Sequence, residues 1–208
     1  MLYKNAVEST TLEILKELCL HPSLTDFGLG GGTNITLRKG HRFSFDLDFF
    51  TDKPFNTSTI YKTITTCFKN TELLFEQNQT MMFMINGVKV DFILYPFDWS
   101  YPFEISDGLR LISLEDIIPM KLQALSNRFS KKDFWDIDLL LHEYPLEKMV
   151  SLFKTKFPPI DTGYIIHSLT AFENAEIEED PVCLIPRTWK EVKTNLEQAV
   201  REYTEKLL

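Results

Sequence analysis

The pattern of apolar and polar residues changes character near residue 112. Before that point, short segments rich in apolar residues are separated by turn signals, which is typical of the strands of a sheet. After it, apolar residues recur every three or four positions, as in amphipathic helices. The sequence therefore predicts an α/β (α+β) fold. A domain of residues 1–112 would hold a small mixed sheet and an N-terminal helix, and residues 113–208 would form a helical domain that completes a cleft.

The first half is expected to form a sheet over residues 24–95, with one or two helices against it. Asn86-Gly87 lies between two of its strands and is a strong hairpin signal. The helix candidates are residues 7–20, ending at His21-Pro22, and residues 56–70, with Asn56 or Thr57 at the cap. LTDFGLGGG (24–32) reads as a short strand that runs into a glycine turn. The other strand candidates are FSFDLDFF (43–50), ELLFEQ (72–77), TMMFMI (80–85) and VKVDFILY (88–95).

The second half is expected to be helical throughout. Ser113 is placed to cap its first helix, and Pro119 either starts a fresh helix at its first turn or kinks the existing one. Further prolines separate the later segments. The helix candidates are residues 113–129, 131–144, 145–157, 161–175 and 187–207.

Composition restricts the class of protein. The 208 residues are 44% hydrophobic and 25% charged, the proportions of a globular protein. No run approaches the ~20 apolar residues that span a bilayer, the N-terminal segment reads as a helix and not a signal peptide, and the three scattered cysteines indicate neither a disulfide framework nor a zinc site. We expect a cytoplasmic protein. The net charge of −8 argues against a broadly basic nucleic-acid surface but leaves room for a local basic groove.

Two aspartates in FSFDLDFF are the first candidate for chemistry. Side chains alternate along a strand, so Asp46 and Asp48 would project from one face while Leu47 and Phe49 enter the core. Two carboxylates that close repel each other unless a cation lies between them, and a divalent metal is the usual solution. The alternative is an edge strand on which both carboxylates face water.

Two further features favour the metal. Gly30, Gly31 and Gly32 precede the pair and would let backbone N–H groups approach a phosphate, with the Thr33 hydroxyl beside them. Asp91 lies among apolar residues of another strand, where a buried carboxylate is costly unless it shares a cation. The alternative for the three glycines is an ordinary loop, and the alternative for Asp91 is a charged residue at the end of a strand.

This order of motifs resembles the polymerase-β superfamily of nucleotidyltransferases, which has a glycine turn, a D-x-D strand and a third carboxylate on a later strand. GGTNITLRKGHRFSFDLDFF narrows the resemblance to the AbiEii/AbiGii toxin-like nucleotidyltransferases. The family's K-x-x-A-x-x-x-R helix and K/R-D-x-x-D segment match Lys121, Ala124 and Arg128, followed by Lys132, Asp133 and Asp136. The resemblance covers roughly residues 24–140. Many superfamily members have serine where this chain has Thr33, which keeps the hydroxyl.

The resemblance implies a role for each matched residue. Asp46 and Asp48 would bind two Mg²⁺ ions, or Mn²⁺, that hold a nucleoside triphosphate, and Asp91 would complete one metal site and help deprotonate the acceptor hydroxyl. The nucleotide-binding group would be Gly31, Gly32, Thr33, Arg42, Lys121 and Arg128, with Lys121 reaching the triphosphate.

Other roles stay open at this point. Arg42 could pair with Asp46 or with a phosphate. Arg128 and Lys132 could contact RNA or phosphate, or belong to a solvated helix end. Asp133 and Asp136 could orient Lys121 or Arg128, touch the acceptor, or form an ion pair between the two halves.

The predicted activity is Mg²⁺-dependent transfer of a nucleoside monophosphate to an acceptor hydroxyl. The resemblance implies RNA as acceptor, with the 3′ end of tRNA suggested, in a type IV toxin–antitoxin or phage-defence setting; whether this chain has a cognate antitoxin stays open. The alternatives are nucleotidylation of a partner protein and a nucleotide-binding module without catalysis, against which the presence of all three carboxylates argues.

Overall fold

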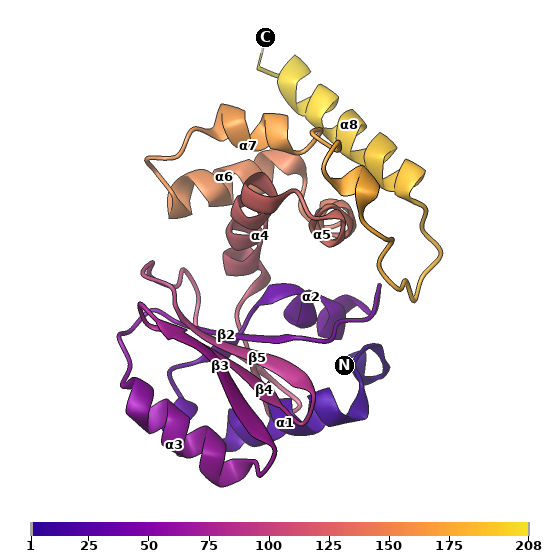
Figure 1. Ribbon diagram of the computed structural model, residues 1–208. Coiled ribbons are helices and arrows are strands. Elements are labelled where there is room, and N and C mark those ends of the chain that lie inside the picture. The colour runs from indigo at the N-terminus through magenta and orange to yellow at the C-terminus, as the bar shows by residue number, and fades with distance from the viewer. Residues whose placement is uncertain (1, 208) are drawn as a thin grey trace. The chain divides into compact units, whose positions relative to one another are not determined.

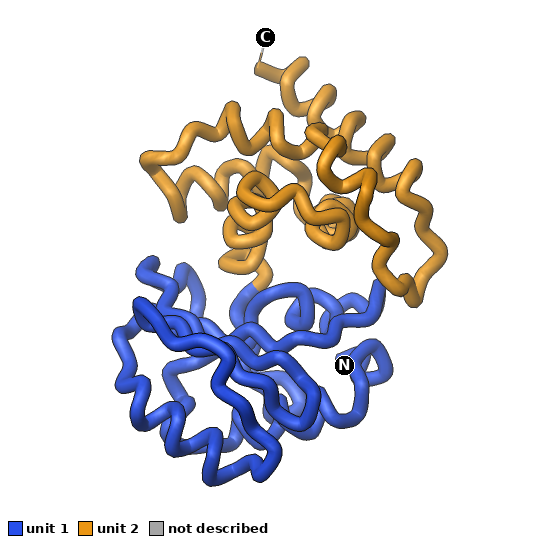
Figure 2. Tube along the Cα trace, in the orientation of Figure 1, with its two compact units in different colours: residues 1–113 blue, residues 114–208 orange. Residues whose placement is uncertain are grey.

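A computed structural model describes residues 2–207, which form two compact units, residues 1–113 and residues 114–208 (Figure 2). The first unit contains a sheet and the second is helical (Figure 1). The α/β class with a mixed sheet followed by helices, predicted from the sequence, is therefore confirmed. Among the described residues, no helix is long and apolar enough to cross a membrane.

The first unit is built on a seven-stranded sheet of order β3-β4-β5-β2-β1-β7-β6. Parallel pairing of β2 with β5 and of β1 with β7 makes the sheet mixed. The strands are β1 (Gly28–Leu29), β2 (Leu47–Thr51), β3 (Thr71–Gln77), β4 (Thr80–Ile85), β5 (Val88–Leu94), β6 (Glu104–Ser106) and β7 (Leu109–Leu111). The helices are α1 (Ser9–Leu20), α2 (Gly31–Lys39) and α3 (Thr57–Cys67), with 3₁₀ turns η1 (Lys4–Ala6) and η2 (Pro22–Leu24).

One face of the sheet forms the hydrophobic core with α1 and α3. Leu47 and Phe49 of β2 are fully buried and pair with Val90 and Phe92 of β5. These side chains belong to the same core cluster as the apolar residues of α1 and α3. The alternation of buried and half-buried residues along β2 and β4 therefore puts Asp48 on the opposite, less buried face of the sheet, beside apolar side chains such as Phe50 and Met82.

Local signals account for several elements as predicted. Asn86 and Gly87 both have positive φ, 49° and 84°, as a two-residue hairpin between β4 and β5 requires. The Asn56 side chain accepts a hydrogen bond from the Thr59 N–H and caps α3. The extents of α1 and α3 follow the predicted helices closely.

Two predictions about the sheet were wrong in extent, the start of one strand and the end of the sheet. Strand β2 begins only at Leu47, because the preceding segment lacks a ladder partner over residues 43–46. The short strand expected before the glycine turn is present as Gly28–Leu29. The sheet also continues past residue 95 through β6 and β7, whose Asp107-Gly108 turn has the positive φ angles of a hairpin and is a signal in the sequence that the prediction passed over.

The second unit consists of five α-helices and one 3₁₀ turn among the described residues. They are α4 (Leu114–Arg128), α5 (Lys131–Leu141), α6 (Leu146–Lys156), α7 (Thr162–Ser168), η3 (Ala175–Ile177) and α8 (Trp189–Glu205). Pro119 lies inside α4 and does not start a new helix. The proline removes one backbone donor, but α4 packs against α5, α6 and α7, and this packing maintains the helix across the missing bond.

Candidate active site

Two of the predicted carboxylates lie side by side on the face of the sheet that points away from the hydrophobic core. Strands β2 and β5 are parallel neighbours, and Asp48 is the register partner of Asp91. Neighbouring strands are about 4.8 Å apart, so these two side chains leave the same face within reach of one ion. Because β2 lies between β5 and β1, it is not an edge strand. Asp91 is the fourth of seven residues of β5, so it is not a charge at a strand end either.

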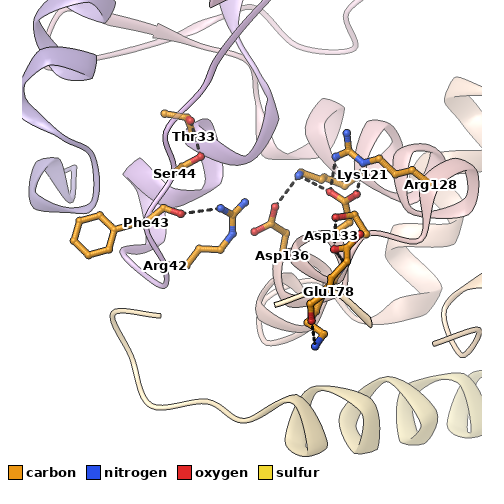
Figure 3. A network of polar contacts seen from close by, with 11 residues as sticks. Thr33, Arg42, Phe43, Ser44, Lys121, Arg128, Asp133, Asp136 and Glu178 are labelled. Atoms are coloured by element: carbon orange, nitrogen blue, oxygen red, sulfur yellow. Dashed lines mark hydrogen bonds and ion pairs between the residues drawn. The ribbon is translucent and has the colours of Figure 1, made fainter. Parts of the chain in front are cut away.

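Asp46 lies in the segment that leads into β2, and the Thr33 side chain holds the backbone of this segment. The Thr33 hydroxyl lies 2.8 Å from Ser44 Oγ (Figure 3). It also lies within hydrogen-bond distance of the Asp46 carbonyl oxygen. Thr33 and Ser44 are both buried. The Thr33 side chain therefore fixes the backbone at Asp46, which leaves the backbone N–H groups at the start of α2 as the groups that could face a phosphate.

The glycine turn packs directly against Asp48. The Gly30 N–H donates to the Asp48 carbonyl oxygen at 2.8 Å, and Gly31 has a φ of +61°. A Cβ atom on Gly31 would stand 2.0 Å from Asp48 Oδ2. Glycine is required here both for its backbone conformation and for space, and the positive end of the α2 dipole lies beside the Asp48 carboxylate.

Lys89 is a member of this cluster that sequence reasoning missed. Its ammonium lies 2.6 Å from Asp91 Oδ2. Burial opposes the charged form of Lys89, yet Asp91, Asp48 and Asp46 together raise its pKa. Lys89 is two residues before Asp91, so the period of a strand alone would have placed both side chains on one face.

Asp91 is buried, with 4% of its surface exposed. Burial raises the pKa of its carboxyl group, although Lys89 acts in the opposite direction, and the charge of Asp46 raises it further. Its Oδ1 atom is buried and has no hydrogen-bond partner among the described residues. A buried carboxylate oxygen without a partner is costly, and a cation is the partner that best compensates for it.

A second polar cluster lies in the helical unit, where α4 meets α5 (Figure 3). Lys121 Nζ is 3.0 Å from Asp133 Oδ1 and 2.7 Å from Asp136 Oδ2. Arg128 donates from Nε to Asp133 Oδ2 at 2.6 Å and from Nη2 to Asp133 Oδ1 at 2.8 Å. Both aspartates are fully buried. Of the roles left open by the sequence, orientation of Lys121 and Arg128 is the one these contacts support.

Paired cations reverse the effect of burial on Asp133. Burial by itself would raise the pKa of this carboxyl group, but Lys121 and Arg128 outweigh it and hold the pKa below its ordinary value of 3.8. The neighbouring Lys132 is exposed, whereas Lys131 is buried and pairs with Asp180 at 3.0 Å. Arg128 and Lys132 are thus the exposed cations of this stretch.

Arg42 is buried, and its Nη1 donates to the Phe43 carbonyl oxygen at 2.9 Å (Figure 3). This contact holds the guanidinium against its own backbone segment. His41 is buried as well.

The acidic cluster of the first unit offers the oxygen ligands that a divalent cation needs. Mg²⁺ in proteins takes one or two carboxylates together with substrate phosphates, and Asp48 with Asp91 supplies such a pair. Within residues 2–207, no group of three or more His, Cys, Asp or Glu side chains is arranged so that it could hold a metal ion by itself. Asp48 and Asp91 fit Mg²⁺ only as the carboxylate part of a site that substrate phosphates would complete, and Lys89 contacts one of the two.

Comparison with known proteins places the chain in a family. The family model "Nucleotidyl transferase AbiEii toxin, Type IV TA system" matches residues 13–207. The chain therefore belongs to the AbiEii nucleotidyltransferase toxins of type IV toxin–antitoxin systems, an enzyme family whose substrate is a nucleoside triphosphate. An uncharacterized protein of Aquifex aeolicus is 36% identical over 192 residues, covering 86% of this chain and 89% of the relative.

Solved structures agree with this fold. JHP933 from Helicobacter pylori matches with a TM-score of 0.64 at 18% identity, over 100% of this chain and 95% of its own. MenT4, a nucleotidyltransferase toxin of Mycobacterium tuberculosis, matches with a TM-score of 0.62 at 11% identity, over 93% of this chain and 83% of its own. The match to the family model confirms the family resemblance and the nucleotidyltransferase class predicted from the sequence, and the solved structures confirm the fold.

Proposed function

We propose that this chain transfers a nucleoside monophosphate from a nucleoside triphosphate to a hydroxyl group of RNA, at the 3′ end of tRNA, in a reaction that depends on Mg²⁺. The observation that carries the proposal is the register of Asp48 with Asp91 beside the Gly31 turn. Carboxylates next to free backbone N–H groups suit a substrate that carries both phosphates and metal ions.

The proposed reaction is an in-line displacement at the α-phosphorus. The acceptor oxygen forms the new bond to phosphorus, the bond to the β-phosphate bridge breaks, and pyrophosphate leaves. Mg²⁺, when bound, would neutralise the phosphate charge and lower the pKa of the attacking hydroxyl. Asp46 and Asp48 would hold the ions, and Asp91 would complete one metal site and help take up the proton that the hydroxyl releases.

The residues around the carboxylates would bind the triphosphate. The first N–H groups of α2, at Gly31, Gly32 and Thr33, have no partner inside the helix and would donate to phosphate oxygens. Arg42 would add a positive charge close to the segment that carries Asp46.

In the helical unit, Lys121 would contact the triphosphate, with Asp133 and Asp136 fixing its ammonium group. Arg128, whose side chain is half exposed, and Lys132 would contact the phosphate backbone of the acceptor. These contacts would position the reactants, which is the larger part of catalysis in phosphoryl transfer.

A protein acceptor is the second candidate. The observation that favours it is the net charge of −8, together with a basic stretch in which Lys131 is buried against Asp180. In that stretch, Arg128 and Lys132 are then the exposed cations that could hold a polyanion. The labelling experiment described next distinguishes an RNA acceptor from a protein acceptor.

The test is transfer of label from each of the four α-³²P-labelled nucleoside triphosphates, with Mg²⁺, into tRNA and into a protein lysate. We expect label in tRNA, none in tRNA whose 3′ hydroxyl has been removed by periodate oxidation, and none with Asp46→Ala. Asp26→Ala removes an exposed carboxylate of the same unit and should transfer like the wild type. Label in protein alone would establish the second candidate, and equal label with Asp46→Ala would disprove the proposed site.

A further inference from the structure

Lys89 is bound to the acidic cluster through one short contact and lies at the edge of solvent. Its Nζ atom is 2.6 Å from Asp91 Oδ2, and its side chain is 38% exposed while that of Asp91 is 6% exposed. The long flexible stem of a lysine lets the ammonium group leave such a partner for water without a change of backbone.

The ammonium group stabilises a set of like charges. Asp46, Asp48 and Asp91 each raise the pKa of Lys89, so its positive charge interacts with all three carboxylates. Asp91 contributes a buried oxygen, Oδ1, with no hydrogen-bond partner among the described residues. One monovalent cation therefore satisfies one oxygen of Asp91 and leaves the other without a partner.

We propose that Lys89 is the resident counter-ion of the carboxylate cluster, and that its ammonium group competes with a divalent cation for Asp91. In the absence of metal it holds the Asp91 carboxylate beside Asp48 and reduces the repulsion between them. When a divalent cation binds, Lys89 releases Asp91 and turns toward solvent. Lys89 is in this account a positioning residue, and the inference rests on the proposed function of the cluster.

Competition between Lys89 and a divalent cation for Asp91 predicts the direction in which metal affinity changes when the lysine is replaced. Two cations cannot occupy the same oxygen of Asp91, and a positive charge a few ångströms from a divalent ion repels it. Removing the Lys89 charge should therefore strengthen metal binding, although it removes a contact from the folded protein. A lysine that only supported the fold would have the opposite effect or none, because its loss would loosen the carboxylates.

The experiment is a titration of the full chain with Mn²⁺ in the absence of nucleotide, followed by the electron paramagnetic resonance signal of free Mn²⁺. We expect Lys89→Met to lower the dissociation constant for Mn²⁺ by about tenfold, the scale of removing one charge at this range. Lys89→Arg keeps the charge and should bind as the wild type does. Lys62→Met removes an exposed charge from α3, which packs on the other face of the sheet, and should change nothing.

Unchanged or weaker Mn²⁺ binding by Lys89→Met, or no binding by any variant, would overturn the inference. If Lys89→Met does not fold, Lys89→Gln, which keeps a donor for Asp91 without the charge, serves for the same titration. Failure of the proposed function gives a different result. Mn²⁺ would still bind more tightly to Lys89→Met than to the wild type, but neither the wild type nor any variant would transfer a nucleotide.

Discussion

Asp91 in the sheet and Asp133 in the helical unit are both buried aspartates, yet their environments act in opposite directions. Burial raises the pKa of Asp91 in spite of Lys89, whereas Lys121 and Arg128 hold the pKa of Asp133 below its ordinary value. Asp133 has a donor on each carboxylate oxygen, and Asp91 Oδ1 has no partner among residues 2–207.

The difference separates two kinds of polar cluster. A cluster in which every oxygen is paired is rigid and stabilises its surroundings. A cluster that keeps an unsatisfied buried oxygen is maintained at a cost in stability, and such costs are concentrated at functional sites. We therefore propose that the sheet cluster holds the metal and the reacting atoms, and that the helical cluster supports and positions the substrates.

The largest expected effect is on catalysis by the sheet cluster. Asp48→Asn should lower nucleotidyl transfer by roughly 10³-fold, the scale of removing one strong electrostatic stabiliser of a transition state. The midpoint temperature of thermal unfolding should not fall, because the substitution removes a negative charge that the neighbouring carboxylates repel. Transfer at the wild-type rate by Asp48→Asn, measured under single-turnover conditions, would refute the assignment.

The contact of the glycine turn with Asp48 can be tested with a matched pair of glycines. Gly31 and Gly87 both have positive φ, but a Cβ on Gly31 meets Asp48 Oδ2 and a Cβ on Gly87 meets nothing within 4 Å. Alanine at either position costs about 1–2 kcal/mol for the backbone conformation. Gly31→Ala should lose about 1–3 kcal/mol more by overpacking.

Gly31→Ala should also lower transfer by about 10²-fold, because displacement of a catalytic group by an ångström has effects of that size. Gly87→Ala should keep its activity. Chemical denaturation and a transfer assay on both variants give the comparison, which fails if the two glycines behave alike.

The helical cluster can be compared with a second buried ion pair of the same unit. Lys121 pairs with Asp133 and Asp136, and Lys156 pairs with Asp116 at 2.7 Å with equal burial. Lys121→Met and Lys156→Met each leave a buried carboxylate without its ammonium partner. Each should lower the free energy of unfolding by about 3–5 kcal/mol in denaturant titrations.

Only Lys121→Met should also weaken nucleoside triphosphate binding, by about tenfold in a calorimetric titration, on the scale of a lost hydrogen bond to a charged group. Similar loss of affinity in Lys156→Met would show that affinity follows stability and would remove Lys121 from the nucleotide site.

The smallest effect concerns pH. A folded-state pKa below the ordinary 3.8 means that ionised Asp133 stabilises the fold above that pH and loses this contribution as the pH falls through its folded-state pKa. The wild type should therefore exceed Asp133→Asn in unfolding free energy near neutral pH, and the difference should narrow in acid. A difference that stays constant down to acid unfolding would contradict the pairing.

Much of this arrangement could be predicted from the sequence, because its causes are local. The Asn86-Gly87 turn, the Asn56 cap and the apolar periodicity of the later helices each depend on a few neighbouring residues. The Asp107-Gly108 hairpin was available by the same rule, and failure to apply it shortened the predicted sheet.

The rest depends on contacts between distant segments. The register of Asp48 with Asp91 follows from parallel pairing of β2 with β5, which no local pattern specifies. The approach of Gly31 to the Asp48 carboxylate is likewise a tertiary contact. Pro119 stays inside α4 because neighbouring helices hold that helix, and packing of this kind overrides a local breaking signal.

The most direct test of the central claim is a crystal structure with Mn²⁺ and a non-hydrolysable nucleoside triphosphate, in which anomalous scattering locates the metal. We predict Mn²⁺ within about 2.2 Å of carboxylate oxygens of Asp48 and Asp91, with the Lys89 ammonium group withdrawn from Asp91. Mn²⁺ and triphosphate bound elsewhere, with Lys89 still in contact with Asp91, would contradict the claim that the carboxylates of the sheet form the active site.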